Sequence, residues 1–359
     1  MSSRRKSAHA NSSFNFRPNV NDSKSDQRGT KPAAGEASVK EVFTLMIIHI
    51  CKKSIFFNTN LKVAIYLGAL FLVSLLADSV RVPKVYLSRS DNVLNQYFVK
   101  FAWGWNLLIL VPYVALTSYV YCCGQVQRMF KHHILRITVA TFLWWFWTTS
   151  FNMIEANYGK CNIKGAEFDT KQSCLKSGHY WNGFDLSGHC FILIYGSLVL
   201  IEEARSMINW ETIKDNIRLE EYDRTLTNKP LSMNPLRNLS NEEFKSLKES
   251  YCKFTPYIRS LFIIITAFQL LWDVMLIGTL LYHHIMIEKF LGGSLAILMW
   301  YFTYKFWFGL PKGGLKLPGD GTFKYNKTKG TTILPVLKRR KTFRSDTSTS
   351  LENKEDSSR

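Results

Sequence analysis

The chain has 359 residues, of which 47% are apolar and 14% aromatic, and it carries a formal net charge of +19. Its mean hydropathy is close to zero, at -0.06, because long charged segments alternate with strongly apolar ones, a pattern typical of an integral membrane protein. Anionic lipid headgroups on the cytosolic face attract basic segments, so the positive charge gives no reason to expect a nucleic-acid partner.

The first 40 residues are rich in Ser, Asn, Lys and Arg and have no apolar core typical of a cleaved signal peptide. We expect a disordered basic cytosolic arm over residues 1–55, followed by a transmembrane domain over residues 56–310. Residues 311–359 are again basic and rich in Gly and Ser, and are expected to be a disordered cytosolic tail.

Six apolar windows are long enough to cross a hydrocarbon core about 30 Å thick. They centre on Leu61 to Ala77, Val99 to Cys123, Ile134 to Phe151, Leu186 to Ile201, Pro256 to Tyr282 and Phe290 to Phe308. The sequence therefore predicts an all-α membrane protein with six transmembrane helices.

The orientation of the six predicted helices follows from the Lys and Arg residues, which are in excess on cytosolic flanks. One set of alternating segments, which contains both termini and the long loop 202–255, holds 33 of the 46. The opposite set, which contains the loop 153–185, holds 8. Both termini are therefore predicted to be cytosolic and the loop 153–185 to face the lumen.

Cysteines and glycosylation motifs are placed consistently with this orientation. Cys161 and Cys174 both lie in the predicted lumenal loop, where a disulfide would fit an oxidising compartment, whereas the other five are expected to be free packing residues. Four N-x-S/T sequons begin at Asn11, Asn21, Asn238 and Asn326. All four lie on the predicted cytosolic side, so we expect none to be glycosylated.

The start of the fourth window combines residues that suit an anion. Asp185 and Ser187 are of the types that cap helices, and Gly188 lets another group approach the backbone closely. Because the free N–H groups of a helix start favour phosphate, this stretch predicts a phosphate site with the imidazole of His189 beside it. The alternative is that His189 is an interfacial anchor among lipid headgroups.

A second histidine site, His283 and His284, ends the fifth window at the same predicted membrane depth as His189. Histidine can supply both groups that phosphoryl hydrolysis needs: one attacks phosphorus and the other protonates the leaving oxygen. This scheme needs no metal or cofactor, and the His and Cys residues lack the spacing of a structural zinc site.

Other ionisable and aromatic groups have ordinary interpretations. Asp273 must pair or face a wet cavity inside the fifth window, and with the histidines it would permit a proton-coupled carrier, although the sequence has no inverted repeat. The aromatic cluster over residues 143–151 is expected to serve packing and an interfacial belt. Glu202, Glu203 and Arg205 are expected to form a solvated cap.

Three stretches resemble one family. The run GFDLSGHCFIL at 183–193 matches a signature of the fat storage-inducing transmembrane (FIT) proteins nearly completely, and residues 271–284 and 288–308 resemble the last two spans of that family. Cys161 and Cys174 agree with the family as well. The resemblance extends over roughly residues 60 to 310.

The resemblance implies a fold and an activity. FIT proteins are six-span proteins of the endoplasmic reticulum (ER) with cytosolic termini and a helical core like that of lipid phosphatases, and they support lipid droplet formation. Their implied reaction, on the lumenal side, cleaves the diphosphate of fatty acyl-CoA to acyl 4′-phosphopantetheine and adenosine 3′,5′-bisphosphate. By this resemblance His189 is the acid and His284 the nucleophile, with His283 at a variable position.

Further roles follow from the same resemblance. Asp185, Ser187 and Gly188 would bind the substrate's phosphates, and Phe191 and Leu193 match an F-x-L element with a role in lipid contact. Glu288 is the candidate to orient His284, the alternative being that it only ends the turn. The rival function is a non-catalytic protein that binds diacylglycerol or triacylglycerol and partitions it into droplets.

One departure from the phosphatase pattern concerns charge. No K-x₆-R-P element precedes the motifs, and Gly278 stands where phosphatases carry an Arg six residues before the nucleophile. In phosphatases those cations hold the phosphate, so the sequence leaves the phosphate-binding cation unidentified.

Overall fold

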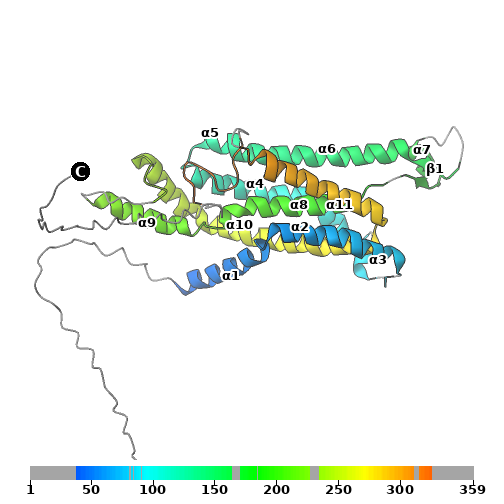
Figure 1. Ribbon diagram of the computed structural model, residues 1–359, viewed down its shortest axis with the longest axis horizontal. Helices are drawn as coiled ribbons and strands as arrows, with labels where there is room; N and C mark the ends of the chain where they lie inside the picture. The colour runs from blue at the N-terminus through cyan, green and yellow to red at the C-terminus, as the bar shows by residue number, and fades with distance from the viewer. Residues whose placement is uncertain are drawn as a thin grey trace, which may run out of the picture. The chain divides into compact units, whose positions relative to one another are not determined.

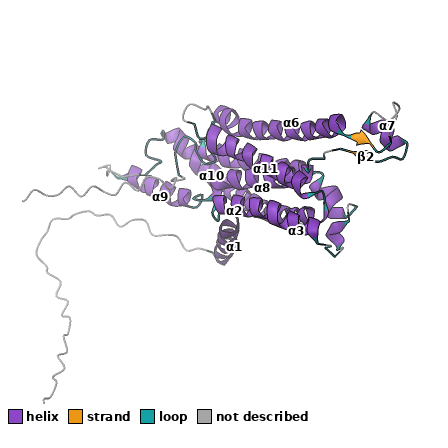
Figure 2. Ribbon diagram, turned by 45° about the vertical axis from the view of Figure 1, so that its right-hand side comes forward, coloured by secondary structure: helices purple, strands orange, loops and turns teal. Residues whose placement is uncertain are grey.

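The computed structural model describes residues 38–80, 82–83, 85–89, 91–163, 170–183, 185–226, 234–310 and 315–325. In chain order the elements, with η for 3-10 and π-helical segments, are α1 (Val39–Ile55), α2 (Thr59–Gly68), η1 (Ala69–Val73), α3 (Ser74–Ser79), η2 (Tyr86–Ser88), η3 (Leu94–Val99), α4 (Ala102–Tyr121), α5 (Val126–Met129), η4 (Phe130–Ile134), α6 (Leu135–Tyr158), β1 (Lys160–Cys161), α7 (Lys171–Lys176), β2 (Trp181–Asn182), α8 (Gly188–Ala204), η6 (Arg205–Met207), α9 (Thr212–Thr225), α10 (Asn241–Tyr282), α11 (Met286–Trp300) and η7 (Tyr301–Trp307). The long helices run side by side along one axis (Figure 1), and the two short strands pair at one end (Figure 2).

The all-α prediction is confirmed at the level of helices. Each of the six apolar windows falls in a helical segment. Among the described residues, three helices are long and apolar enough to cross a membrane: Thr59–Ser79, Ala102–Tyr121 and Asn241–Tyr282.

Helix α8 lies at the centre of the bundle, where it packs against α4, α6, α10 and α11. Every residue from Cys190 to Ala204 is buried. A helix that is apolar on all sides has no face for water, so its place is the core. Both ends of α8 carry polar groups, and these hold the sites described below.

Helix α10 continues well beyond the fifth apolar window. It begins with a capping box, in which Ser240 and Glu243 exchange side-chain and backbone hydrogen bonds, and its 42 residues extend roughly 63 Å. That is about twice the thickness of a hydrocarbon core. The predicted loop 202–255 is therefore largely helical, since its α9 and the first part of α10 pack around the stacked rings of Trp210 and Tyr251.

Helix α1 corrects the predicted N-terminal arm. Residues 39–55 are not disordered: Ile48, Cys51 and Ile55 are buried at helical spacing, and α1 packs against α10. Lys52 adds a hydrogen bond from its Nζ to the carbonyl of Ile208, 3.1 Å away. The basic residues around this stretch obscured its apolar face. The rest of the predicted arm lies outside the described residues.

A second correction concerns the C-terminal tail. Residues 315–325 fold back on the bundle, with Phe323 and Tyr325 buried. The Tyr325 hydroxyl donates to the carbonyl of Ser206 at 2.9 Å, and Thr322 N–H donates to the carbonyl of Tyr121 at 2.9 Å. Residues 326–359 lie outside the described part of the chain.

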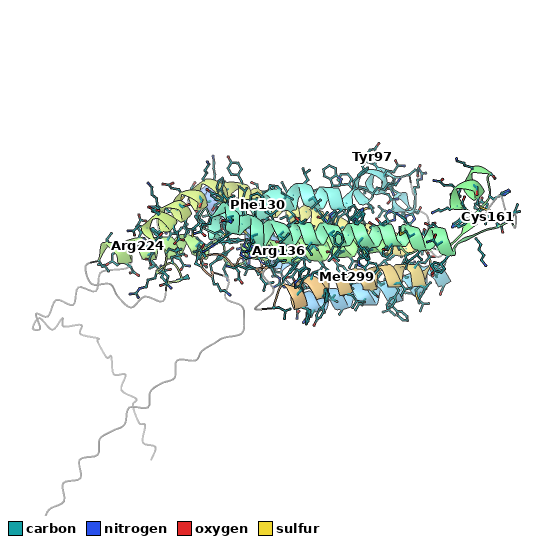
Figure 3. The ribbon with its side chains drawn as sticks, turned by 90° about the horizontal axis from the view of Figure 1, so that it is seen from above. Tyr97, Phe130, Arg136, Cys161, Arg224 and Met299 are labelled. Atoms are coloured by element: carbon teal, nitrogen blue, oxygen red, sulfur yellow. A yellow bond between two sulfur atoms is a disulfide. The ribbon has the colours of Figure 1, made fainter. Side chains whose placement is uncertain are left out.

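The C-terminal end of α8 is buried, so the expected solvated cap is wrong. Glu202 and Glu203 are 3% and 1% exposed. Glu203 receives two hydrogen bonds of 2.5 Å from Arg136 of α6 and one of 2.7 Å from the Tyr304 hydroxyl. Burial here depends on an ion pair between residues far apart in sequence, which satisfies both charges. Figure 3 shows Arg136 within the long bundle.

Asp273 is paired, as its position inside an apolar helix requires. Its carboxylate accepts from Lys62 Nζ at 3.0 Å and from the Tyr66 hydroxyl at 2.6 Å, both on α2, and from Gln269 Nε2 at 3.2 Å. This cluster therefore ties α2 to α10.

The predicted disulfide is present between Cys161 and Cys174, and it closes the hairpin that joins α6 to α8. Figure 3 shows it at the end of the molecule beyond the helices. The other five cysteines are free.

In the aromatic cluster over residues 143–151, Trp144 stacks on Trp103 with ring centroids 5.8 Å apart, and Phe151 packs edge-on against Phe191. Packing is therefore confirmed as one role of this cluster.

Candidate active site

The histidines that the sequence singled out meet at one end of the bundle, where α10 ends and α8 begins. They line a cavity of about 310 Å³. The residues that line it are Asp91, Asn95, Gln96, Lys100, His189, His283 and His284. Three segments far apart in sequence thus build one site.

His189 is presented by the first turn of α8. Ser187 caps this helix by accepting from Cys190 N–H at 3.3 Å, and its side chain is buried. A β-carbon built at Gly188 would meet no atom within 4 Å, so the helix start faces open space. His189 lines the histidine cavity, whereas Asp185, Ser187 and Gly188 are not among its described lining residues.

His284 lies in the short connection between α10 and α11, with φ at +60°. Few residues other than Gly adopt this left-handed conformation, which here turns the chain sharply after α10. Its Nδ1 lies 3.3 Å from Glu288 Oε2 and 3.7 Å from Asp185 Oδ2. A carboxylate can only accept a hydrogen bond, so these contacts favour the tautomer with the proton on Nδ1 and the lone pair on Nε2.

Glu288 also holds the surrounding backbone. Its carboxylate accepts from Ile285 N–H at 3.4 Å, which caps α11, and from Asp185 N–H at 3.3 Å, and its own carbonyl accepts from Ser187 N–H at 3.4 Å. One residue thereby connects the segment of His284 to the segment that precedes His189. Glu288 is thus within reach of His284 and also caps α11, and its role in orienting the His284 ring stays a prediction.

The start of α11 is fixed from two sides. Asp78 of α3 accepts from Met286 N–H at 2.7 Å and pairs with Lys289, whose Nζ also donates to the carbonyl of Leu280. On the other side a β-carbon at Gly292 would come within 2.7 Å of the Ser187 carbonyl. Only glycine permits this approach of α11 to the start of α8.

The neighbouring titratable groups are shifted by their surroundings. Burial, together with the nearby His284 and Lys289, lowers the pKa of His283, whose ring stacks on that of His189 with centroids 6.5 Å apart. Partial burial raises the pKa of the Asp185 carboxyl, against the lowering effect of His284. Both shifts favour the uncharged forms.

Comparison with known proteins decides the family of the chain. The model of the fat storage-inducing transmembrane protein family matches residues 83–304, which contain all three cavity histidines. The chain belongs to this family.

Several similar proteins carry one name. A Drosophila melanogaster protein named acyl-coenzyme A diphosphatase FITM2 is 54% identical over 88% of this chain and 74% of its own length. Proteins of the same name from Danio rerio and Homo sapiens are 34% and 30% identical, covering 68% and 66% of this chain and 84% and 78% of their own lengths. No solved structure matches the chain.

Two residues of the family motif lie away from the cavity of this FIT protein. Phe191 is buried between Phe151 and Tyr195, with ring centroids at 5.3 and 5.6 Å. Leu193 is buried in the same apolar core. In this conformation both side chains support the position of α8 rather than line the histidine cavity.

Sequence analysis missed four lining residues, Asp91, Asn95, Gln96 and Lys100, which lie in and beside η3. The sequence did indicate that they could lie there, because the predicted topology puts the start of the second span on the same side as the histidines.

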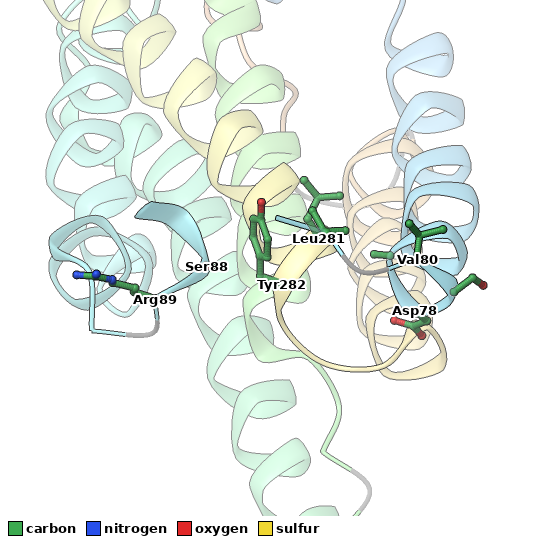
Figure 4. A pocket seen from close by; sticks show the side chains of 9 residues that line it. Asp78, Val80, Ser88, Arg89, Leu281 and Tyr282 are labelled. Carbon is green, nitrogen blue, oxygen red and sulfur yellow. The ribbon is translucent and has the colours of Figure 1, made fainter. Parts of the chain in front are cut away.

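A second cavity of about 720 Å³ adjoins the end of α10. It includes Arg89, Asp78 and Tyr282, and Figure 4 shows Arg89 and Asp78 on opposite sides of Tyr282.

The histidine cavity offers groups for acid, base and nucleophilic chemistry. Within the described ranges, no group of three or more His, Cys, Asp or Glu side chains is arranged to hold a metal ion. The chemistry that these residues themselves can supply is attack by an imidazole whose proton is held on Nδ1, assisted by a second imidazole.

Proposed function

We propose that this chain is an ER fatty acyl-CoA diphosphatase that cleaves the CoA diphosphate into acyl 4′-phosphopantetheine and adenosine 3′,5′-bisphosphate. The observation that carries the proposal is the contact of His284 Nδ1 with Glu288 and Asp185, in a cavity shared with His189. The name of the relatives supports the same substrate.

In the proposed reaction His284 Nε2 attacks one phosphorus of the diphosphate. The bond from that phosphorus to the bridging oxygen breaks, and the leaving phosphate takes a proton from His189, leaving a phosphohistidine. Water, deprotonated by His189, then hydrolyses the phosphohistidine and restores His284. Glu288 and Asp185 hold the His284 ring and stabilise the positive charge that it gains.

Substrate binding follows from the arrangement of the same end of the bundle. The N-terminus of α8 at Ser187 and Gly188 would receive a phosphate, since helix N–H groups favour an anion. Phe191 and Leu193 would contact the acyl chain only if α8 and its neighbours part, because both are buried.

We further propose that six helices cross the membrane around a core like that of lipid phosphatases, with both termini cytosolic and the cavity lumenal. The distribution of Lys and Arg supports this orientation, as does the disulfide between α6 and α8, which suits an oxidising lumen. The projection of α10 beyond a bilayer's thickness then lies on the cytosolic side.

A second candidate function is the binding of diacylglycerol or triacylglycerol for droplet formation. An apolar groove of about 450 Å³ between α4 and α6 favours it. The groove is lined by Leu107, Val111, Ile134, Ile137, Thr138, Thr141, Phe142 and Trp145. A groove on the bundle's side would accept acyl chains without any reaction at the histidines.

The deciding experiment is hydrolysis of oleoyl-CoA by the detergent-purified chain, with acyl phosphopantetheine detected by mass spectrometry. Wild type should form the product, and His189→Ala and His284→Ala should each lower the rate by about 10³-fold or more, as loss of a nucleophile or its acid does. Absence of product from wild type would favour the lipid-binding function.

His283→Ala is the matched control, because His283 lines the same cavity but makes no ion pair with a carboxylate in the described structure. It should retain far more activity than His284→Ala. If His283→Ala is inactive and His284→Ala is active, the nucleophile has been assigned to the wrong residue.

A further inference from the structure

The proposed reaction requires a cation that the family resemblance does not supply. The diphosphate of CoA carries two negative charges, and phosphate groups in proteins are commonly held by Lys or Arg. Gly278, which stands in place of the phosphatase Arg, faces Leu87, whose side chain lies 3.6 Å from where its β-carbon would be. The substitute must therefore come from another part of the chain.

Among the described residues that line the histidine cavity, Lys100 is the only Lys or Arg. Its side chain is exposed, and within the described part of the chain no carboxylate lies at ion-pair distance from it. Lys289, in the first turn of α11, is 1% exposed and already pairs with Asp78. Arg89 lines the adjacent cavity instead (Figure 4).

The local backbone explains how Lys100 reaches the cavity together with two amide side chains. Residues Leu94–Val99 form a π-helical turn, closed by a hydrogen bond of 3.1 Å from Lys100 N–H to the Asn95 carbonyl. This i to i+5 hydrogen bond places Lys100 about one turn beyond Asn95, and both residues line the cavity together with Gln96. The segment thus presents one cation and two amides to the histidines.

We propose that Lys100 binds the diphosphate of the substrate, with Gln96 as a neutral hydrogen-bond donor beside it. This inference rests on the proposed function and assigns a phosphate subsite to the same cavity. Lys100 acts as a fixed positive charge facing the anion while His284 and His189 carry out the reaction. Asp91 also lines the cavity, but within the described residues it forms no ion pair with Lys100.

The test compares Lys100→Met with Lys100→Arg and with Lys176→Met. Lys176 is an exposed lysine of α7 at the same end of the molecule, so its substitution removes the same charge outside the cavity. Oleoyl-CoA hydrolysis is measured for each variant, and binding of inorganic pyrophosphate is measured separately by calorimetry. Thermal midpoints establish that the variants are folded.

We expect Lys100→Met to lower kcat/KM by about 10- to 100-fold, mainly through KM, and to weaken pyrophosphate binding by a similar factor. The kcat/KM of Lys100→Arg should stay within about fivefold of that of wild type. The kcat/KM of Lys176→Met should equal that of wild type. Equal values for Lys100→Met and Lys176→Met would overturn the proposal, as would absence of pyrophosphate binding by wild type.

The two measurements separate this inference from the proposed function. If wild type does not hydrolyse oleoyl-CoA, the proposed function fails, but loss of pyrophosphate binding in Lys100→Met alone still supports the subsite. If Lys100→Met does not fold, Lys100→Gln replaces it, because the amide keeps a polar group at this exposed position, and the same outcomes apply.

Discussion

Substitution of Arg136 by Met should destabilise the protein more than any exposed charge substitution, because it leaves Glu203 buried without its cation. Arg136 and Glu203 both have fully buried side chains and are joined by two hydrogen bonds of 2.5 Å. The guanidinium also donates to the carbonyl of Lys316, so it connects α6, the end of α8 and the C-terminal segment.

The loss in the free energy of unfolding that Arg136→Met should cause has a lower and an upper limit. Removing one partner of a buried ion pair costs about 3 to 5 kcal/mol, and the remaining bond from Tyr304 to Glu203 places this case near the lower end. For a domain of this size about 3 kcal/mol corresponds to a fall in Tm on the order of 10 °C. Unfolding in detergent can be followed by tryptophan fluorescence, since the chain has 10 Trp.

Two controls make the measurement specific. Arg136→Met combined with Glu203→Met removes both charges and should regain most of the lost stability. Lys305→Met removes a partner of Glu202, which keeps its bond to Arg205, and should shift Tm by only a few degrees. A Tm for Arg136→Met like that of wild type, or a double variant as unstable as the single one, would refute the reasoning.

Three further predictions concern the site and the orientation. Glu288→Gln should lower kcat for oleoyl-CoA about 10- to 100-fold with little change in KM, because a charge-assisted hydrogen bond to His284 is lost; an unchanged kcat in steady-state assays would contradict it. Cys161→Ser should destabilise the hairpin by about 3 kcal/mol, seen as faster proteolysis there, while the thermal midpoint of the bundle stays nearly constant; equal cleavage rates would argue against it. Asn238 should stay unglycosylated in microsomes. The Lys171→Asn variant, which completes a sequon in the hairpin, should gain a glycan that endoglycosidase removes. The opposite pattern would show that the predicted orientation in the membrane is reversed.

The sequence predicted those features that depend on local composition. Apolar windows located the helices, and the short run around His189 located one side of the cavity, because helix caps and apolar length are properties of contiguous residues. Helix α1 could have been predicted in the same way, because Ile48, Cys51 and Ile55 have helical spacing. The charge of the flanking residues instead led to a prediction of disorder.

Features that depend on distant partners were not predictable from one sequence. Glu203 was expected in water because its charge is costly in a core, and only the approach of Arg136, 67 residues earlier, makes its burial acceptable. The predicted topology placed Lys100 on the same side as the histidines, but its contact with the end of α10 depends on how distant helices pack, which one sequence does not show.

The two polar ends of α8 explain why the catalytic geometry can depend on residues far from the cavity. His189 begins this helix and Glu203 nearly ends it, and the residues between them are buried on all sides. A packed core is not continuously deformable, so the position of His189 is set by the whole helix. His284, by contrast, is held by Glu288 through the short connection to α11. Weakening the Arg136 pair should therefore disturb His189 and the start of α8, where we propose that a phosphate binds, before it disturbs His284.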